Sequence, residues 1–217
     1  MTTGENFWDR VATKTNLGRV GQKMLEATLG YLNPSDLILD VGCGDGTLTD
    51  SIAKNVSSIE AIDISTKMIE IAKSHTSQKN IHFKKSTLED AGYKSHQFDA
   101  VLAFNVLHFI EHKQDLSQRI FDLIKPGGYF ISCTACAGDH FSLLRIALLI
   151  LMKCRLIPRL SFLKTSELQR CLANVGFEII KTENLSDLPD HFIVVQKPQT
   201  NPAAVAQQSL CKSLHCF

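Results

Sequence analysis

Short apolar runs alternate with amphipathic segments along residues 37–132. Each run is almost wholly apolar, as is typical of a strand that is buried on both faces of a parallel sheet. The segments between the runs place apolar residues at helical spacing. Strands that alternate with helices indicate an α/β fold, in which helices cover both faces of a mostly parallel sheet. The predicted strands are at 37–41, 59–63, 81–83, 98–104 and 129–132, and the predicted helices are at 48–54, 66–73 and 113–124.

The alternation stops at both ends of the chain. An apolar stripe at helical spacing over residues 5–32 predicts a helix there, within an N-terminal helical cap of residues 1–34. Residues 198–217 are polar and aperiodic, which predicts a flexible tail. The predicted core domain is therefore residues 35–197, with seven strands in all. Its last part contains predicted helices at 141–156 and 165–175 and two closing strands at 177–182 and 192–197.

Composition and charge exclude several classes of protein. With 217 residues, of which 44% are hydrophobic, the chain fits one folded domain and not a disordered one. The net charge is +1, so there is no chain-wide basic field and no nucleic-acid partner is expected. Residues 1–10 lack the apolar core of a signal peptide, and the apolar run at 146–152 is too short for a bilayer. The seven cysteines fit reduced thiols, so we expect a cytoplasmic protein.

A glycine-rich turn follows the first predicted strand. Gly42, Gly44 and Gly46 alternate with larger residues there, and glycine lets a chain turn tightly and approach a ligand closely. The helix that follows presents free N–H groups at its start. Asp63 ends the second predicted strand, where a carboxylate can accept hydrogen bonds from both hydroxyls of a ribose. Together these features predict a cofactor that contains an adenosine-like group.

Two acidic residues distinguish this turn from a phosphate-binding loop. Asp40 precedes the glycines and Asp45 stands among them. Carboxylates repel a pyrophosphate but attract a cation, and the spacing G-x-G-x-G departs from the dinucleotide fingerprint G-x-G-x-x-G. The sulfonium and amino groups of S-adenosylmethionine (SAM) satisfy this demand, so SAM is the predicted cofactor.

Four segments, in order along the chain, resemble the motifs of class I SAM-dependent methyltransferases, and in particular the small-molecule group that acts on quinones and sterols. They are residues 39–46, residues 62–65 with Met68, residues 98–101, and residues 123–130, which resemble the family's Leu-Lys-Pro-Gly-Gly turn into the fifth strand. The match in order and spacing extends over about half of the chain, residues 35–135. The resemblance implies a Rossmann-like, seven-stranded fold with a helical substrate lid after the fifth strand, at residues 138–165.

The resemblance also implies the residues that bind SAM. The methionyl part would contact the glycine turn and the end of the fourth strand, the ribose would be held at the end of the second strand, and the adenine would lie beside it. The implied residues are Asp40, Gly42, Gly44 and Asn105 for the methionyl part, Asp63 for the ribose, and Ile64 and Met68 for the adenine. The family usually has an aspartate after the third strand that contacts the adenine amine. This chain has Thr87 and Leu88 there, so the hydroxyl of Thr87 and the backbone of Leu88 are the predicted substitutes.

Methyl transfer from a sulfonium is an in-line displacement that needs alignment and the exclusion of water more than a particular catalytic group. An acceptor that loses a proton can need a base, and His108, shortly after Asn105, is the candidate by its position and its titration range. Packing beneath the cofactor or substrate is the alternative role for His108. The Asn/Asp-Pro-Pro-aromatic motif of amine methylation is absent at residues 105–108, which disfavours adenine and glutamine amides as acceptors.

The segment after the fifth strand bears on the identity of the acceptor. Residues 141–155 are apolar on nearly every side of a helix, and residues 140–166 contain five basic residues and no acidic one. Such a helix can be a lid over a hydrophobic substrate, a contact with an anionic membrane surface, or an ordinary core or oligomer contact. We expect a small, apolar or lipid-like acceptor, methylated on O, N or C. The alternatives are an RNA or protein methyltransferase that uses residues 145–164, and a non-catalytic SAM-binding protein.

Two sequence patterns are similar to those of metal-binding sites. Residues 108–112 match H-x-x-E-H, and Cys133 with Cys136 forms a C-x-x-C pattern. The first lacks a third ligand and the second lacks another cysteine pair, so no metal is expected. Trp8 is the only tryptophan and lies in a segment, residues 7–10, that fits either a helix folded over the cofactor or an ordinary packing contact.

Overall fold

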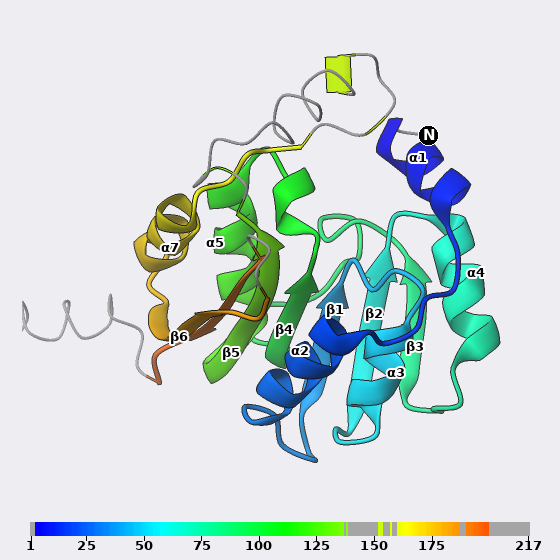
Figure 1. Ribbon diagram of the computed structural model, residues 1–217. Coiled ribbons are helices and arrows are strands. Elements are labelled where there is room, and N and C mark those ends of the chain that lie inside the picture. The colour runs from blue at the N-terminus through cyan, green and yellow to red at the C-terminus, as the bar shows by residue number, and fades with distance from the viewer. Residues whose placement is uncertain are drawn as a thin grey trace, which may run out of the picture.

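A seven-stranded sheet forms the centre of the protein (Figure 1). The strand order is β3-β2-β1-β4-β5-β7-β6, and neighbouring strands are parallel except where β7 is one of the pair. The predicted α/β fold with a mostly parallel sheet is therefore confirmed. The strands are β1 (Leu37–Val41), β2 (Ser58–Asp63), β3 (Ile81–Lys85), β4 (Phe98–Phe104), β5 (Ile124–Ala135), β6 (Glu178–Asn184) and β7 (Asp190–Gln196). This computed structural model describes residues 3–136, 138, 152–153, 157, 160–186 and 190–199, with the backbone alone for residues 3–5.

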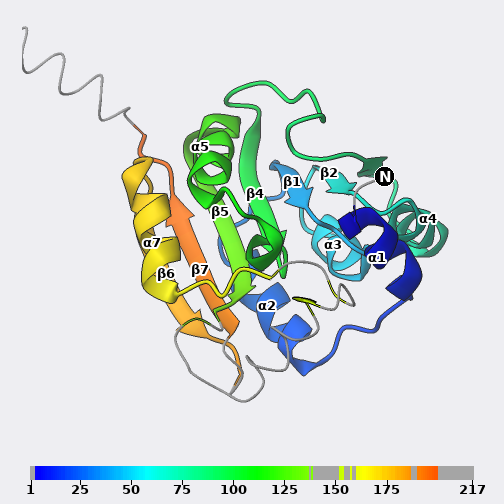
Figure 2. The ribbon, with the colours of Figure 1, turned by 90° about the horizontal axis from the view of Figure 1, so that it is seen from above.

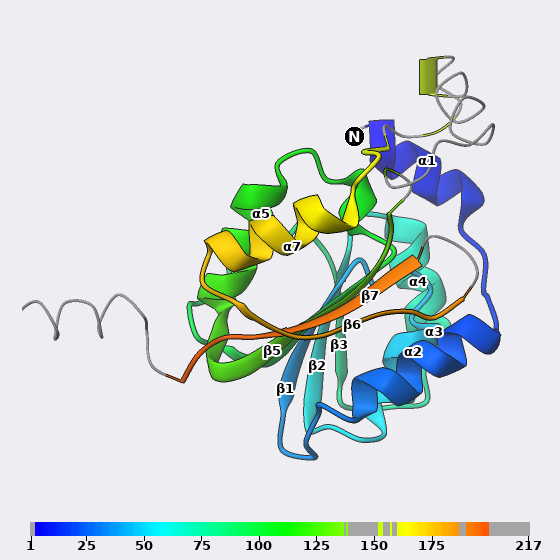
Figure 3. The same ribbon diagram turned by 60° about the vertical axis from the view of Figure 1, so that its left-hand side comes forward.

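Helices cover both faces of the sheet, as predicted. Helices α2, α3 and α4 pack on one face, and α5 and α7 pack on the other (Figure 2, Figure 3). Helix α1 lies beyond the ends of the strands, next to α4 (Figure 3). The helices are α1 (Thr3–Val11), α2 (Arg19–Leu29), α3 (Thr47–Ala53), α4 (Thr66–His75), α5 (Lys113–Leu123) and α7 (Thr165–Asn174), with a short 3-10 helix, η1 (Leu107–Phe109).

The two faces of the sheet form two separate hydrophobic cores. Successive side chains of a strand point to opposite faces, and the central strands follow this rule. In β1, Ile38 packs with α2, α3 and α4, whereas Leu39 packs with α5 and α7. In β4, Leu102 lies in the core with α2, α3 and α4, and Val101 lies in the core with α5 and α7. Because both faces are buried, these strands contain the continuous apolar runs from which they were predicted.

The predicted N-terminal helix at 5–32 is wrong in one respect, because the structure divides it into α1 and α2. Residues 12–18 between them are not helical. Thr13, Thr15 and Asn16 are residue types whose side chains compete with helical hydrogen bonds, and the hydroxyl and backbone N–H of Thr15 both donate to Asp45. A contact with a distant part of the chain therefore overrides the helical spacing.

Several predictions lie outside the described residues. These are most of the predicted lid helix at 141–156, and with it the predicted contact with anionic membrane, and the tail after residue 199. Within the part of the chain that the structure describes, no helix has the length and apolar character needed to cross a membrane.

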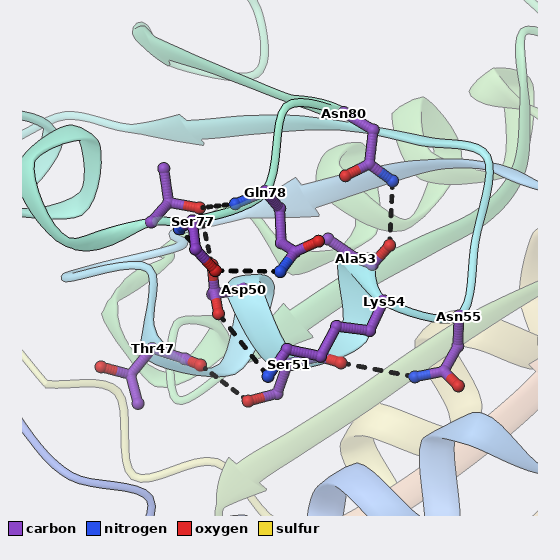
Figure 4. A network of polar contacts seen from close by, with 10 residues as sticks. Thr47, Asp50, Ser51, Ala53, Lys54, Asn55, Ser77, Gln78 and Asn80 are labelled. Atoms are coloured by element: carbon purple, nitrogen blue, oxygen red, sulfur yellow. Dashed lines mark hydrogen bonds and ion pairs between the residues drawn. The ribbon is translucent and has the colours of Figure 1, made fainter.

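The sheet order reverses between β1 and β4, since β1 pairs with β2 on one side and with β4 on the other. The loops that leave these two strands therefore run in opposite directions, and a crevice opens at their carboxyl ends. Helix α3, which follows the glycine turn of β1, is tied to the rest of the fold by polar contacts (Figure 4). Asp50 accepts hydrogen bonds from the hydroxyl of Thr76 at 2.7 Å and from the N–H of Ser77 at 3.1 Å.

The side-chain amide of Asn80 binds the backbone at the C-terminal end of α3. The Nδ2 group of Asn80 donates to the carbonyl of Ala53 at 2.9 Å and to that of Val56 at 3.0 Å. Replacement of Asn80 by alanine leaves both carbonyls without this donor, so we expect Asn80→Ala to lower the free energy of unfolding by about 1–2 kcal/mol in urea denaturation. The exposed Asn55 makes one long bond, 3.4 Å to the carbonyl of Ser51 (Figure 4). Asn55→Ala is the matched control, and it should change the free energy of unfolding by less than about 0.5 kcal/mol. Equal losses of stability in the two variants would contradict the role of Asn80 at the end of α3.

Candidate functional site

A cavity of about 1670 Å³ opens at the carboxyl ends of the central strands. All of the residues predicted to bind the cofactor line it, although they come from four different loops. They are Asp40, Gly42 and Gly44 after or within β1, Asp63, Ile64 and Met68 at the end of β2 and in α4, Thr87 and Leu88 after β3, and Asn105 after β4. The sheet topology therefore brings these residues to one site.

The glycine turn has the conformation that its spacing predicts. Gly42, Gly44 and Gly46 all have positive φ angles, +75°, +56° and +75°. A Cβ atom on Gly42 would lie 2.4 Å from Cγ2 of Val106, so close packing excludes a side chain there. A Cβ atom on Gly44 would meet no protein atom within 4 Å. Gly44 therefore leaves open space on the cavity wall, which is what close approach of a cofactor requires.

Asp63 is held in place by backbone donors. One carboxylate oxygen accepts from the N–H of Gly44 at 3.0 Å and the other accepts from the N–H of Ser65 at 2.8 Å. Burial raises the pKa of Asp63, while these hydrogen bonds act in the opposite direction. Each oxygen keeps a second lone pair, so the oriented carboxylate can still accept from the two hydroxyls of a ribose.

Asp40 is more deeply buried than Asp63, with 3% of its surface exposed. The hydroxyl of Thr49 donates to its carboxylate at 2.6 Å. Burial, opposed by the hydrogen bond from Thr49 and aided by the nearby charge of Asp63, raises the pKa of Asp40 to about 6. Two carboxylates that are difficult to ionise together at one end of a cavity favour a cationic ligand.

The loops after β3 and β4 complete this end of the cavity. The hydroxyl of Thr87 donates to Asp90 at 2.9 Å and accepts from the N–H of Asp90 at 3.1 Å. It is thus partly engaged within its own loop, and its contact with adenine stays a prediction. Leu88 is buried at 3% exposure. Asn105 has φ +56°, an uncommon value for a residue with a side chain, and its N–H donates to the carbonyl of Cys133 at 2.8 Å.

The N-terminal strap, defined here as residues 3–18, crosses the open side of the cavity. Asp9 of α1 accepts from the hydroxyl of Ser65 at 2.5 Å and from the N–H of Lys67 at 3.2 Å, at the start of α4. The ring of Trp8 packs edge-on against Phe109 with centroids 5.0 Å apart, and Trp8 lines the cavity. The strap therefore joins two separate sides of the site.

A second attachment of the strap could not be expected from the sequence. The hydroxyl of Thr15 donates to Asp45 at 2.8 Å, and the carbonyl of Thr15 accepts from the hydroxyl of Thr47 at 3.2 Å. Asp45 also accepts from the N–H of Thr47. Asp45 was expected only to supply negative charge to the glycine turn, whereas in the structure it also binds the strap. The only hint of this contact in the sequence is that Thr13, Thr15, Asn16 and Gly18 are poor helix formers.

His108 is the one predicted site residue that is not among the residues lining the cavity. Burial lowers its pKa to about 4, which leaves the imidazole neutral at physiological pH. Its Nδ1 atom is buried without a hydrogen-bond partner among the described residues, and its ring packs against Phe109 with centroids 4.1 Å apart. The role of His108 as a base stays a prediction, and its placement favours the packing role.

Apolar side chains outside the predicted cofactor-binding residues also line the cavity. They come from the strap, from α2, from η1 and the residue after it, and from the segment that precedes α7: Leu17, Val20, Met24, Phe109, Ile110, Met152, Ile157 and Leu160. Lys153, one of the basic residues of the segment at 145–164, lines the cavity together with Ser161 and Glu111. Within the described chain, no group of three or more histidine, cysteine, aspartate or glutamate side chains is placed to hold a metal ion.

A family model described as a methyltransferase domain matches residues 14–182. The chain belongs to this family. The predictions of a class I methyltransferase and of SAM as its cofactor are therefore confirmed. The residues present fit SAM, because two buried carboxylates face an open space above Gly44, which suits a cationic ligand that approaches the backbone.

Similar proteins include two named ubiquinone biosynthesis O-methyltransferases. The one from Xanthomonas axonopodis pv. citri (strain 306) is 27% identical over 183 residues, which cover 80% of this chain and 76% of that protein. The one from Coxiella burnetii (strain Dugway 5J108-111) is 32% identical over 93 residues, 42% of this chain and 40% of that protein. A solved SAM-dependent methyltransferase from Mesorhizobium loti has the same fold, with a TM-score of 0.68 at 17% identity over 83% of this chain and 99% of that one.

Substitution of Gly44 tests the open space on the cavity wall. We expect Gly44→Ala to weaken the binding of S-adenosylhomocysteine, the demethylated product of SAM, by at least about tenfold, because a methyl group in a tight contact costs about 1–3 kcal/mol. The fluorescence of Trp8, the only tryptophan of the chain, can report binding because Trp8 lines the cavity.

Gly92→Ala is the matched control for this experiment. Gly92 has a similar left-handed conformation, φ +77°, and a Cβ atom there would also meet nothing within 4 Å. Both substitutions should lower stability by about 1 kcal/mol through backbone strain, and only Gly44→Ala should reduce affinity. Unchanged affinity in Gly44→Ala would show that the cofactor does not approach this residue.

The raised pKa of Asp40 predicts how SAM binding depends on pH. Below pH 6 the carboxyl takes up a proton and no longer attracts the sulfonium, so affinity for SAM should fall by about tenfold between pH 7 and pH 5. S-adenosylhomocysteine lacks the charged sulfur and should show a smaller fall in parallel calorimetric titrations. The folded pKa lies above 3.8, the ordinary value for an aspartate, so Asp40 should also make the unliganded protein less stable as pH rises from about 4 to about 6. Identical pH profiles for the binding of SAM and of S-adenosylhomocysteine would contradict the expected attraction between Asp40 and the sulfonium.

Proposed function

We propose that this methyltransferase transfers the methyl group of SAM to an oxygen atom of a small, apolar acceptor. The observation that carries the proposal is that one cavity is lined both by the acidic residues predicted to bind the cofactor and by many apolar side chains. An acceptor in contact with Met24, Phe109 and Leu160 would need an apolar surface to displace water from them favourably. The choice of oxygen is supported by the relatives, which are named O-methyltransferases.

The residues predicted to bind the cofactor have distinct proposed roles. Asp63 would accept hydrogen bonds from the ribose hydroxyls, since Gly44 and Ser65 fix its orientation. Asp40 would supply negative charge near the methionyl part and is held by Thr49. The adenine would lie against the apolar side chains of Ile64, which directly follows β2, of Met68 in α4, and of Leu88 in the loop after β3. When bound, SAM supplies a methyl group that is already activated by its sulfonium.

The remaining contribution of the chain is alignment and the exclusion of water. The strap is attached to α4 through Asp9 and to the glycine turn through Thr15. Trp8 and Phe109 form an apolar wall at the open side. An acceptor enclosed by these groups has few orientations, and restriction of this kind lowers the barrier of a reaction between two bound molecules. Exclusion of water also prevents hydration of the attacking oxygen.

Methyl transfer from radiolabelled SAM into lipid, quinone, RNA and protein fractions of a cell extract tests the proposal. We expect label in an apolar small-molecule fraction, with the methyl group attached to oxygen. Asp63→Ala should weaken SAM binding by about 2–3 kcal/mol, the scale for loss of a charged hydrogen-bond partner, and should lower labelling in the same proportion at limiting SAM. Label confined to RNA or protein, or found on nitrogen or carbon, would overturn the proposed acceptor.

A further inference from the structure

A buried lysine meets a serine hydroxyl at the wall of the cavity. Lys113 is the first residue of α5 and is 9% exposed. Its Nζ atom lies 2.6 Å from Oγ of Ser161, which lines the large cavity. A lysine ammonium can only donate hydrogen bonds. The hydroxyl oxygen of Ser161 is therefore the acceptor in this pair.

The position of Lys113 is unfavourable for a cation in two respects. The first turn of a helix is the positive end of the helix dipole, where acidic residues are favoured. Apolar side chains also surround the lysine, among them Leu116, Leu168 and Leu172, and burial of an ammonium costs free energy unless it is paired. The thiol of Cys171 is close enough for the charge of Lys113 to act on its pKa. The hydroxyl of Ser161 is the hydrogen-bond partner that the structure gives this ammonium.

The backbone of Ser161 is fixed as firmly as its side chain. Its N–H donates to the carbonyl of His108 at 2.7 Å, and its carbonyl accepts from the N–H of Leu163 at 2.8 Å. One lone pair of the hydroxyl is engaged by Lys113, so the O–H proton is available to a group in the cavity. A hydroxyl that accepts from a cation becomes a stronger donor, because hydrogen bonds in a chain polarise one another.

We propose that Ser161 donates a hydrogen bond to the acceptor's oxygen, and that Lys113, which acts through Ser161 as a positioning residue, favours the ionised form of that oxygen. This inference rests on the proposed function. The acceptor's hydroxyl proton leaves to solvent and the oxygen forms a bond to the methyl carbon. The carbon–sulfur bond breaks and sulfur keeps its electron pair. Because the charge of Lys113 assists the loss of the proton, the step needs no histidine base, in agreement with the placement of His108 away from the cavity lining.

Ionisation of a bound chromophoric phenol tests the inference without turnover. 4-Nitrophenol absorbs visible light in its ionised form, so its pKa can be measured while it is bound to the full chain loaded with S-adenosylhomocysteine. We expect a lower pKa for bound than for free nitrophenol. Ser161→Ala and Lys113→Met should each reduce the ionisation constant of the bound phenol by about tenfold, or one pKa unit. Lys113→Arg keeps the charge and should retain most of the shift.

Ser117→Ala is the matched control. Ser117 is 4% exposed and lies beside Lys113 in the same apolar surroundings, but it does not line the large cavity. This variant should leave the bound pKa unchanged. Each variant is compared only if it keeps the wild-type affinity for S-adenosylhomocysteine; if Lys113→Met fails to fold, Ser161→Ala decides the result.

The outcomes separate this inference from the proposed function. If nitrophenol binds but its pKa equals that of free nitrophenol, or does not respond to Ser161→Ala, the role of Ser161 is wrong while the hydroxyl acceptor stands. If the loaded protein binds no nitrophenol, the proposed acceptor is itself overturned and the inference fails with it.

Discussion

Burial of two like charges at the reversal point of the sheet is the constraint on which the site depends. Asp40 and Asp63 lie near the carboxyl ends of the adjacent parallel strands β1 and β2, so the sheet brings their charges close together and removes them from water. Hydrogen bonds from Thr49 and from the backbone of Gly44 and Ser65 make this burial tolerable. The left-handed glycine turn is part of the same arrangement, because it brings the N–H of Gly44 to Asp63 and leaves open space beside it. A cationic cofactor is the natural complement of such a site.

The apolar part of the cavity lining has a different physical character from these carboxylates, and it is built from chain segments that are remote in sequence. The strap contributes Trp8 to the wall and is attached to α4 through Asp9 and to the glycine turn through Thr15. The segment before α7 contributes Leu160 and Ser161. Apolar contact would select the acceptor, while a single polarised hydroxyl would determine which of its atoms faces the methyl group. Such a division is typical of small-molecule sites, where apolar walls surround a few polar groups.

The local elements could be predicted because their causes are local. Continuous apolar runs located β1 and β4 at their observed bounds, and the predicted helix at 66–73 begins where predicted, directly after Ser65, whose hydroxyl accepts from the N–H of Met68. The break between α1 and α2 was missed, because it depends on a contact of Thr15 with a residue thirty positions away. His108 was placed near the cofactor by its distance from Asn105, but η1 leads it away from the cavity lining.

The sequence by itself determined the fold class and the cofactor, and the residues that it predicts for cofactor binding all line one cavity. Glycines and acidic residues that follow apolar runs lie at the carboxyl ends of strands. In a parallel sheet these ends all lie at the same edge, so the residues come together there. Tertiary structure alone decided which remote residues meet there. No repeating pattern in the sequence links the segments that are joined by the pairs Asp9–Ser65, Thr15–Asp45 and Lys113–Ser161. Such contacts arise because buried charges and hydroxyls must find partners once the two cores have closed, and the identity of those partners depends on packing in three dimensions.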